Sequence, residues 1–123
     1  MHVAVFSSRS YDRRFLAEAN RAAGSPHLLR HIDANLDAST AVLAGDATAV
    51  CLFVNDRADA QALASLQRSG VRLVALRCAG FNNVDLAAAA GLGMEVARVP
   101  RYSPEAVAEH TVAMMLALDR HIH

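Results

Sequence analysis

The sequence contains no lysine, and all twelve of its basic side chains are arginines. Schiff-base catalysis requires a lysine amine and the phosphate-binding P-loop requires a lysine as well, so both mechanisms are excluded. Twelve acidic residues balance the arginines, and neither sign of charge is gathered into a block. An evenly mixed surface of zero net charge argues against nucleic acid and against an anionic membrane as partners.

Cysteine is also scarce, since the chain has only Cys51 and Cys78 and no secretory signal precedes them. We therefore expect two free thiols rather than a disulfide. The N-terminus has no basic region before its first apolar run. No apolar run approaches the ~20 residues that span a bilayer. Together these absences predict a soluble, cytoplasmic protein without a membrane partner.

The 123 residues, 54% of them hydrophobic, suffice for one compact domain. Apolar runs of strand length alternate with segments of helical periodicity. We predict strands at 3–6, 27–32, 49–54, 71–76 and 94–99, and helices at 10–23, 59–69, 83–91 and from 103 onward. Asp59, Asn83 and Ser103 are the predicted helix caps. The order predicts an α/β fold, a flavodoxin-like doubly wound parallel sheet of five strands with helices on both faces.

In such a fold, ligands bind outside the carboxyl ends of the strands. The fourth strand is followed there by Cys78, Ala79 and Gly80, whose loop has backbone amides suited to a carboxylate or phosphate near a helix N-terminus. Spacing alone leaves open an ordinary turn with a capping Asn. Tyr102 follows the fifth strand and has two interpretations, a hydroxyl offered to a ligand or a partly buried aromatic.

Other polar residues are weaker candidates for chemistry. Glu105 and Glu109 share a helix face, but a first-turn charge and a surface residue explain them better than catalysis. The histidines form no metal-ligand pattern. The sequence Gly91-Leu92-Gly93 follows a helix and precedes a strand, which is the reverse of a dinucleotide-binding loop, so we predict a turn there.

The last helix is apolar on nearly all sides. Val107, Met114 and Leu118 belong to one stripe, and Val112 and Leu116 make the opposite side apolar too. A five-stranded domain can cover only one of these sides, so we expect another domain to pack on the helix. We therefore divide the chain into residues 1–102, the N-terminal part of a substrate-binding domain, and residues 103–123, an interdomain helix that ends before a nucleotide-binding domain.

Three strings carry a resemblance to a known family: FVND at 53–56, RCAGFNNVDL at 77–86 and VPRYSPEAVAEHTVAMMLALDR at 99–120. They resemble the NAD-dependent D-2-hydroxyacid dehydrogenases, and among these the fermentative D-lactate dehydrogenases. The resemblance implies a flavodoxin-like catalytic domain in which backbone amides at Cys78, Ala79 and Gly80 hold the substrate carboxylate. It further implies that Tyr102 points into the active site, that Phe53 lines the substrate side chain and that Val107 lies near the nicotinamide of NAD.

The same resemblance places the family's glycine-rich NAD loop and its catalytic Arg, acid and His downstream of the matching region. No catalytic residue is therefore assigned in this chain, and His110 is not promoted to that role. We expect the full-length protein to reduce pyruvate or another small 2-keto acid as a homodimer, and the 123-residue chain alone to be inactive. The alternative is a non-catalytic module that binds a small anion or dimerises through its last helix.

Overall fold

A five-stranded, entirely parallel sheet organises the chain in the computed structural model, which describes residues 1–122. The strand order is β2-β1-β3-β4-β5. The strands are β1 (His2–Val5), β2 (Leu28–His31), β3 (Ala49–Leu52), β4 (Leu73–Leu76) and β5 (Glu95–Arg98). The helices are α1 (Ser10–Ala22), the short 3-10 helix η1 (Ala41–Ala44), α2 (Ala60–Arg68), α3 (Leu86–Gly91) and α4 (Pro104–Asp119). The predicted fold class is confirmed.

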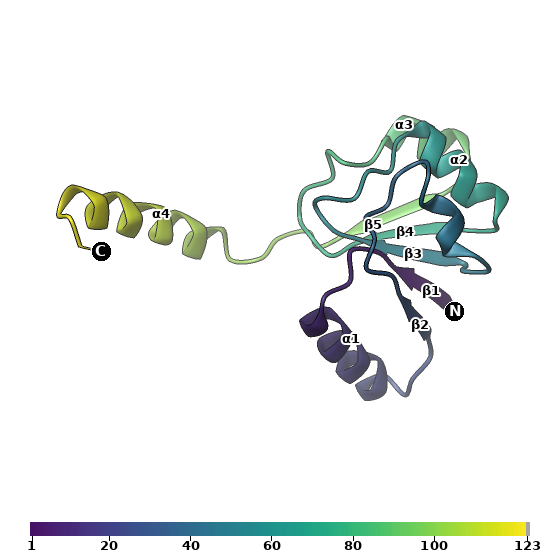
Figure 1. Cartoon of the computed structure of the whole chain (residues 1–123), viewed down its shortest axis with the longest axis horizontal. Helices are drawn as coiled ribbons and strands as arrows, with labels where there is room; N and C mark the ends of the chain where they lie inside the picture. Colours follow the sequence, from purple (N-terminus) through teal and green to yellow (C-terminus); the bar gives the residue numbers. More distant parts are fainter. Residues whose placement is uncertain (123) are drawn as a thin grey trace.

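The main core lies between the sheet and the layer formed by α2, α3 and η1 (Figure 1). Val50 of β3 is completely buried there together with Leu63 and Leu66 of α2. Burying a leucine side chain contributes about 1.5–3 kcal/mol, so this layer holds much of the stability. Asp59 starts α2 as predicted, because its carboxylate accepts a hydrogen bond of 3.0 Å from the Ala62 amide.

The opposite face of the sheet is covered only in part. The helix α1 lies on that side (Figure 1), but none of its residues is buried. Leu16 of α1 borders a groove of about 240 Å³ whose floor includes Val5, Cys51 and Ala75 of three neighbouring strands. Helices therefore lie on both faces, as predicted, with a close-packed layer on one face and an open apolar groove on the other.

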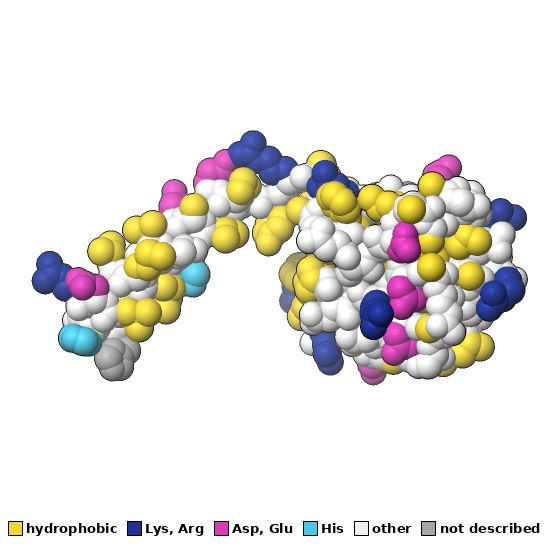
Figure 2. Space-filling model, turned by 90° about the horizontal axis from the view of Figure 1, so that it is seen from above, with side chains coloured by type: hydrophobic (Ala, Val, Ile, Leu, Met, Phe, Trp, Pro, Cys, Tyr) yellow, Lys and Arg dark blue, Asp and Glu magenta, His cyan; other side chains and the backbone are white. Residues whose placement is uncertain are grey.

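The helix α4 extends away from the domain, and the extended segment after β5 connects the two (Figure 1). None of the residues of α4 is buried, and apolar side chains are spread along the helix in the space-filling view (Figure 2). The helix is therefore left without cover by residues 1–102, and its role as an interdomain helix stays a prediction. No helix within residues 1–122 has the length and apolar character needed to cross a membrane.

Two predicted helix caps are also wrong. Asp85, rather than Asn83, caps α3, since its carboxylate accepts a 2.9 Å hydrogen bond from the Ala88 amide. Ser103 precedes α4 in a left-handed conformation (φ 32°, ψ 57°) and makes no side-chain cap. A capping hydroxyl requires an extended N-cap residue. The predicted glycine turn is confirmed, because Gly93 adopts φ 66° between α3 and β5.

Candidate functional site

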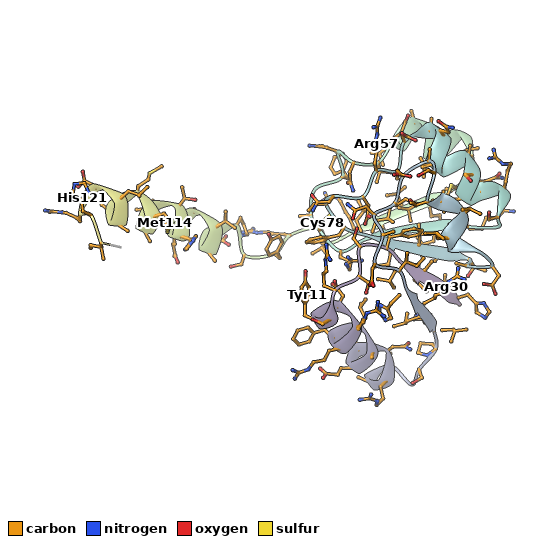
Figure 3. The ribbon with its side chains drawn as sticks, in the orientation of Figure 1. Tyr11, Arg30, Arg57, Cys78, Met114 and His121 are labelled. Carbon is orange, nitrogen blue, oxygen red and sulfur yellow. The ribbon has the colours of Figure 1, made fainter. Side chains whose placement is uncertain are left out.

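The residues predicted to bind substrate gather at the carboxyl edge of the sheet, where Cys78 is labelled in Figure 3. They line two hollows that adjoin at Tyr102. The first hollow, of about 370 Å³, is lined by Phe53, Val54, Arg77, Cys78, Val99 and Tyr102. The second hollow, of about 340 Å³, is lined by Ala79, Pro100, Arg101, Tyr102, Pro104 and Val107. The fold thus brings together every predicted substrate or cofactor residue except Gly80, which lines neither hollow.

The loop after β4 carries unpaired backbone amides. Within residues 1–122, the N–H groups of Ala79, Gly80 and Phe81 donate no hydrogen bond. The carbonyl oxygens beside them are occupied: that of Cys78 accepts from the Val99 amide (3.2 Å) and that of Ala79 from Arg98 Nη1 (3.0 Å). Because α3 begins only at Leu86, these amides lie before its first turn rather than at the predicted helix N-terminus. Any ability of these amides to bind an anion therefore comes from the loop conformation and not from a helix N-terminus.

Arg77 forms the charged wall of the first hollow. Its side chain is only 11% exposed and reaches from the end of β4 to the ends of β1 and β3. It donates to the carbonyl oxygens of Phe6 (3.0 Å), Ser7 (3.3 Å) and Cys51 (3.3 Å). Its Nε lies 3.4 Å from Asp12 Oδ1 on α1 but is not aligned for a hydrogen bond. The charge of Arg77 is thus compensated within the protein by Asp12 and by three carbonyl oxygens, and the side chain ties the ends of β1, β3 and β4 together.

The guanidinium of Arg77 also stacks on the Phe53 ring, 5.2 Å from its centroid. The backbone of Phe53 is held from two sides. Its amide donates to Asp56 Oδ2 (2.6 Å), and its carbonyl accepts from Asn83 Nδ2 (2.9 Å). Asn83 donates as well to the carbonyl of Asp56 (2.9 Å). Instead of capping α3, Asn83 ties the loop after β3 to the loop after β4 and so fixes one wall of the hollow.

Asp56 is buried and joins three segments of this edge. Besides the Phe53 amide, its carboxylate accepts from Ser7 Oγ (2.6 Å) and from the Leu36 amide (2.8 Å). Ser7, at the end of β1, holds a left-handed backbone with φ 51°. All of these hydrogen bonds are internal to the protein. Asp56 therefore organises the edge and leaves the hollow itself apolar apart from Arg77.

Tyr102 and Val107 are exposed on the side of the site that α4 borders, with 64% and 57% of their surfaces accessible. Of the two interpretations of Tyr102, the partly buried aromatic is therefore excluded. Arg101 pairs with Glu105 in an i,i+4 ion pair, which agrees with a surface role for that acid. His110 is exposed on α4, and its side chain makes no hydrogen bond within residues 1–122.

Both thiols are free, as predicted. Burial raises the pKa of Cys51, and the nearby Arg77 offsets that effect only in part, so the thiol stays protonated at neutral pH. No group of three or more His, Cys, Asp or Glu side chains in the described part of the chain is arranged to hold a metal ion.

Sequence reasoning missed two residues of this edge, Arg77 and Arg98. Each comes directly at the end of an apolar strand, Arg77 after Leu73–Leu76 and Arg98 as the last residue of β5. A lone charge at the carboxyl end of a parallel strand was the available signal. The hydrogen-bond partners of both arginines include carbonyl oxygens of loops distant in sequence, and no local sequence pattern reveals them.

The chain belongs to the D-isomer specific 2-hydroxyacid dehydrogenases. The model of that family's catalytic domain matches residues 3–122. The sequence is 49% identical to the D-lactate dehydrogenase of Escherichia coli over 123 residues, which are all of this chain and 37% of that enzyme.

Solved structures agree with this assignment. The apo-structure of D-lactate dehydrogenase from Escherichia coli superposes with a TM-score of 0.88 over the whole chain, which covers 38% of that structure. The D-lactate dehydrogenase with NAD⁺ from Lactobacillus jensenii is 31% identical with a TM-score of 0.73, over 99% of this chain and 37% of that one. The chain thus spans little more than a third of the length of these relatives.

Proposed function

We propose that this chain is the substrate-binding part of an NAD-dependent D-2-hydroxyacid dehydrogenase of the D-lactate type, which reduces pyruvate to D-lactate. The observation that carries the proposal is the loop after β4, whose amides at Ala79 and Gly80 have no internal acceptor and whose carbonyls are already bonded. Two adjacent N–H donors in this state are suited to the carboxylate of a 2-keto acid. Family membership and the similarity to D-lactate dehydrogenases support the same substrate class.

In this proposal each predicted residue has a separate task. The amides at Cys78, Ala79 and Gly80 hold the carboxylate, and Arg77, paired with Asp12, fixes the strand ends behind them. The ring of Phe53, fixed by Arg77 and Asp56, faces the substrate side chain and limits its size. The exposed hydroxyl of Tyr102 lies where the two hollows adjoin and is available as a hydrogen-bond donor to the substrate. No catalytic acid or base is assigned within this chain.

The residues present fit one side of a nicotinamide cofactor only. Val107 and Pro104 offer apolar surface in the second hollow beside Ala79, against which a nicotinamide ring can pack. The sequence contains no glycine-rich dinucleotide loop that would bind the pyrophosphate. Bound NADH supplies the hydride that reduces the keto carbon. The chain's own part is to hold the carboxylate and orient the carbonyl carbon.

The exposed surfaces support the proposed division of the chain. Residues 1–102 form the substrate-binding domain, and residues 103–123 contribute an interdomain helix that packs against a nucleotide-binding domain. The helix α4 is apolar on several sides, and none of its residues is buried. Such a helix needs cover from other parts of a protein. For the full-length enzyme we propose a cytoplasmic homodimer as well.

A chimera tests the proposed activity. Residues 1–123 replace the matching segment of the Escherichia coli D-lactate dehydrogenase, which is 49% identical over that length. We expect the chimera to oxidise NADH with pyruvate and to release D-lactate, with kcat/KM within about tenfold of the parent, or ~1.4 kcal/mol in transition-state binding. A chimera that folds and binds NADH but does not turn over pyruvate or a larger 2-keto acid contradicts the proposal.

The isolated 123-residue chain is the matched control. We expect no NADH-dependent pyruvate reduction from it, because hydride transfer requires a held cofactor and a proton donor. If the isolated chain bound pyruvate while the chimera stayed inactive, the alternative of a non-catalytic anion-binding module would be favoured.

A further inference from the structure

Arg98 contacts both loops that border the candidate site. Its Nη1 lies 3.0 Å from the Ala79 carbonyl oxygen in the loop after β4. The same nitrogen lies 3.5 Å from the Val99 carbonyl and 3.2 Å from the Pro100 carbonyl, in the loop that leads to Tyr102. The guanidinium also stacks on Phe81, with 5.4 Å to the ring centroid. One side chain therefore joins the amide loop to the tyrosine loop.

The hydrogen bond to Ala79 determines the direction of the Gly80 amide. In a planar trans peptide the C=O and the following N–H point in opposite directions, and residues 1–122 contain no cis peptide bond. The Ala79 carbonyl points toward Arg98 on the edge strand β5, so the Gly80 N–H points away from β5. The same reasoning applies to the preceding peptide, because the Cys78 carbonyl accepts from the Val99 amide and the Ala79 N–H then points away from β5.

The carbonyls of Cys78 and Ala79 are held by different kinds of hydrogen bond. The Cys78 carbonyl is held by a backbone hydrogen bond that continues the pairing of β4 with β5. The Ala79 carbonyl lies one residue beyond that pairing, and a side chain, that of Arg98, donates to it. Apart from the guanidinium, no hydrogen bond within residues 1–122 holds the peptide between Ala79 and Gly80. Gly80 also allows a wide range of backbone angles there.

We propose that Arg98 is a positioning residue for carboxylate binding, which holds the Ala79–Gly80 peptide so that both amides point to the same side of the loop. Arg98 contacts the backbone of the loop and not the carboxylate itself. The inference rests on the proposed function, since it concerns the same amides. It adds a residue outside both hollows whose loss weakens binding without removing any group that touches the substrate.

The test uses the 123-residue chain labelled with ¹⁵N and titrated with sodium pyruvate at constant ionic strength. Methyl pyruvate, which lacks the carboxylate, is the ligand control. We expect pyruvate but not methyl pyruvate to shift the Ala79 and Gly80 amide resonances. In Arg98→Ala the dissociation constant for pyruvate should rise about tenfold, and the order parameters of the Ala79 and Gly80 amides should fall while the rest of the spectrum is retained.

Two further variants separate position from charge. Arg57→Ala removes an equal charge from an exposed arginine whose side chain pairs with Asp59 and does not hydrogen bond to Ala79, Val99 or Pro100, and it should bind pyruvate like the wild type. Arg98→Lys keeps the charge but loses the planar group that stacks on Phe81, so its affinity and loop order should lie between those of Arg98→Ala and the wild type.

The outcomes distinguish the inference from the proposed function. If the wild-type chain shows no carboxylate-dependent shift at Ala79 and Gly80, the amide site itself is wrong and the inference falls with it. If the wild type binds and Arg98→Ala binds equally well, only the positioning role is overturned. The positioning role is also overturned if Arg98→Ala loses affinity for pyruvate while loop order is unchanged. Wild-type affinity in Arg98→Lys would overturn it as well. Either result would assign Arg98 a purely electrostatic effect.

Discussion

At the scale of single residues, Asp56 shows how one buried carboxylate organises three loops. Its carboxylate accepts hydrogen bonds from Ser7 Oγ and from the amides of Leu36 and Phe53. Asp56 is only 1% exposed. Each donor belongs to a segment that follows or flanks a different strand. In the sequence such a residue is visible only as a polar position after a strand, the last residue of the string FVND at 53–56.

Replacing Asp56 with Ala should strongly destabilise the domain. A buried donor left without its acceptor costs about 1–3 kcal/mol, and three donors would be affected, so a loss on the order of 3 kcal/mol is expected after partial rearrangement. Urea denaturation followed by circular dichroism measures it. Asp33→Ala is the matched control, because Asp33 is 77% exposed in its pair with Arg13 and should change stability by less than about 1 kcal/mol. Equal losses in the two variants would contradict this role of Asp56.

His31 gives the domain a pH dependence near neutrality. Burial, followed by the charge of Arg13, lowers the pKa of His31 below 6.5, and its Nδ1 lies 2.7 Å from Ser8 Oγ. The folded state then binds fewer protons than the unfolded chain, so stability rises with pH and is lost as the pH falls from about 6.5 toward the lower folded-state pKa.

The check is thermal unfolding of the wild type and of His31→Asn at several pH values between about 7.5 and 5.5. The wild type should lose melting temperature toward acid pH, and the variant should lose less. An identical decline in both proteins would show that another group is responsible.

At the scale of secondary-structure elements, the periodic segments were predictable and their ends were not. The five strands and the helices α1, α2, α3 and α4 all lie within or close to the predicted ranges. Asp59 was a correct cap because its side chain needs only the amide of Ala62, three residues away. The prediction of Asn83 as a cap was wrong because its side chain donates instead to the carbonyls of Phe53 and Asp56, which are distant in sequence.

The helix α4 is the element that the rest of the chain leaves uncovered. Met115 and Leu118 are 64% and 67% exposed on a helix that has no buried residue. A stretch of exposed apolar side chains of this kind promotes association between molecules. We therefore expect the 123-residue chain to self-associate, with a sedimentation coefficient that rises with protein concentration.

The double substitution Met115→Glu and Leu118→Glu should abolish most of that association. Arg68→Glu, on the exposed last turn of α2, is the control and should associate like the wild type. A wild-type chain that sediments as a monomer over a wide range of concentrations, with α4 still helical, would contradict this expectation.

At the scale of the whole molecule, the two faces of the sheet differ. The face under α2, α3 and η1 is closed over a continuous core, whereas the face under α1 keeps an open apolar groove. The alternation of strands and helices was enough to predict the parallel sheet and helices on both sides of it. How tightly each side is covered depends on the lengths and tilts of the helices and on side chains that meet across the chain.

The sequence by itself determined the fold class, the carboxyl edge of the sheet as the candidate site, and the family, because hydrophobic periodicity and short motifs are local properties. The tertiary structure decided which groups meet at that edge. Arg77 and Arg98 reach carbonyl oxygens of loops distant in sequence, and Asn83 leaves its predicted cap to join two loops. Hydrogen bonds between such distant loops arise only when parallel strands place their ends side by side.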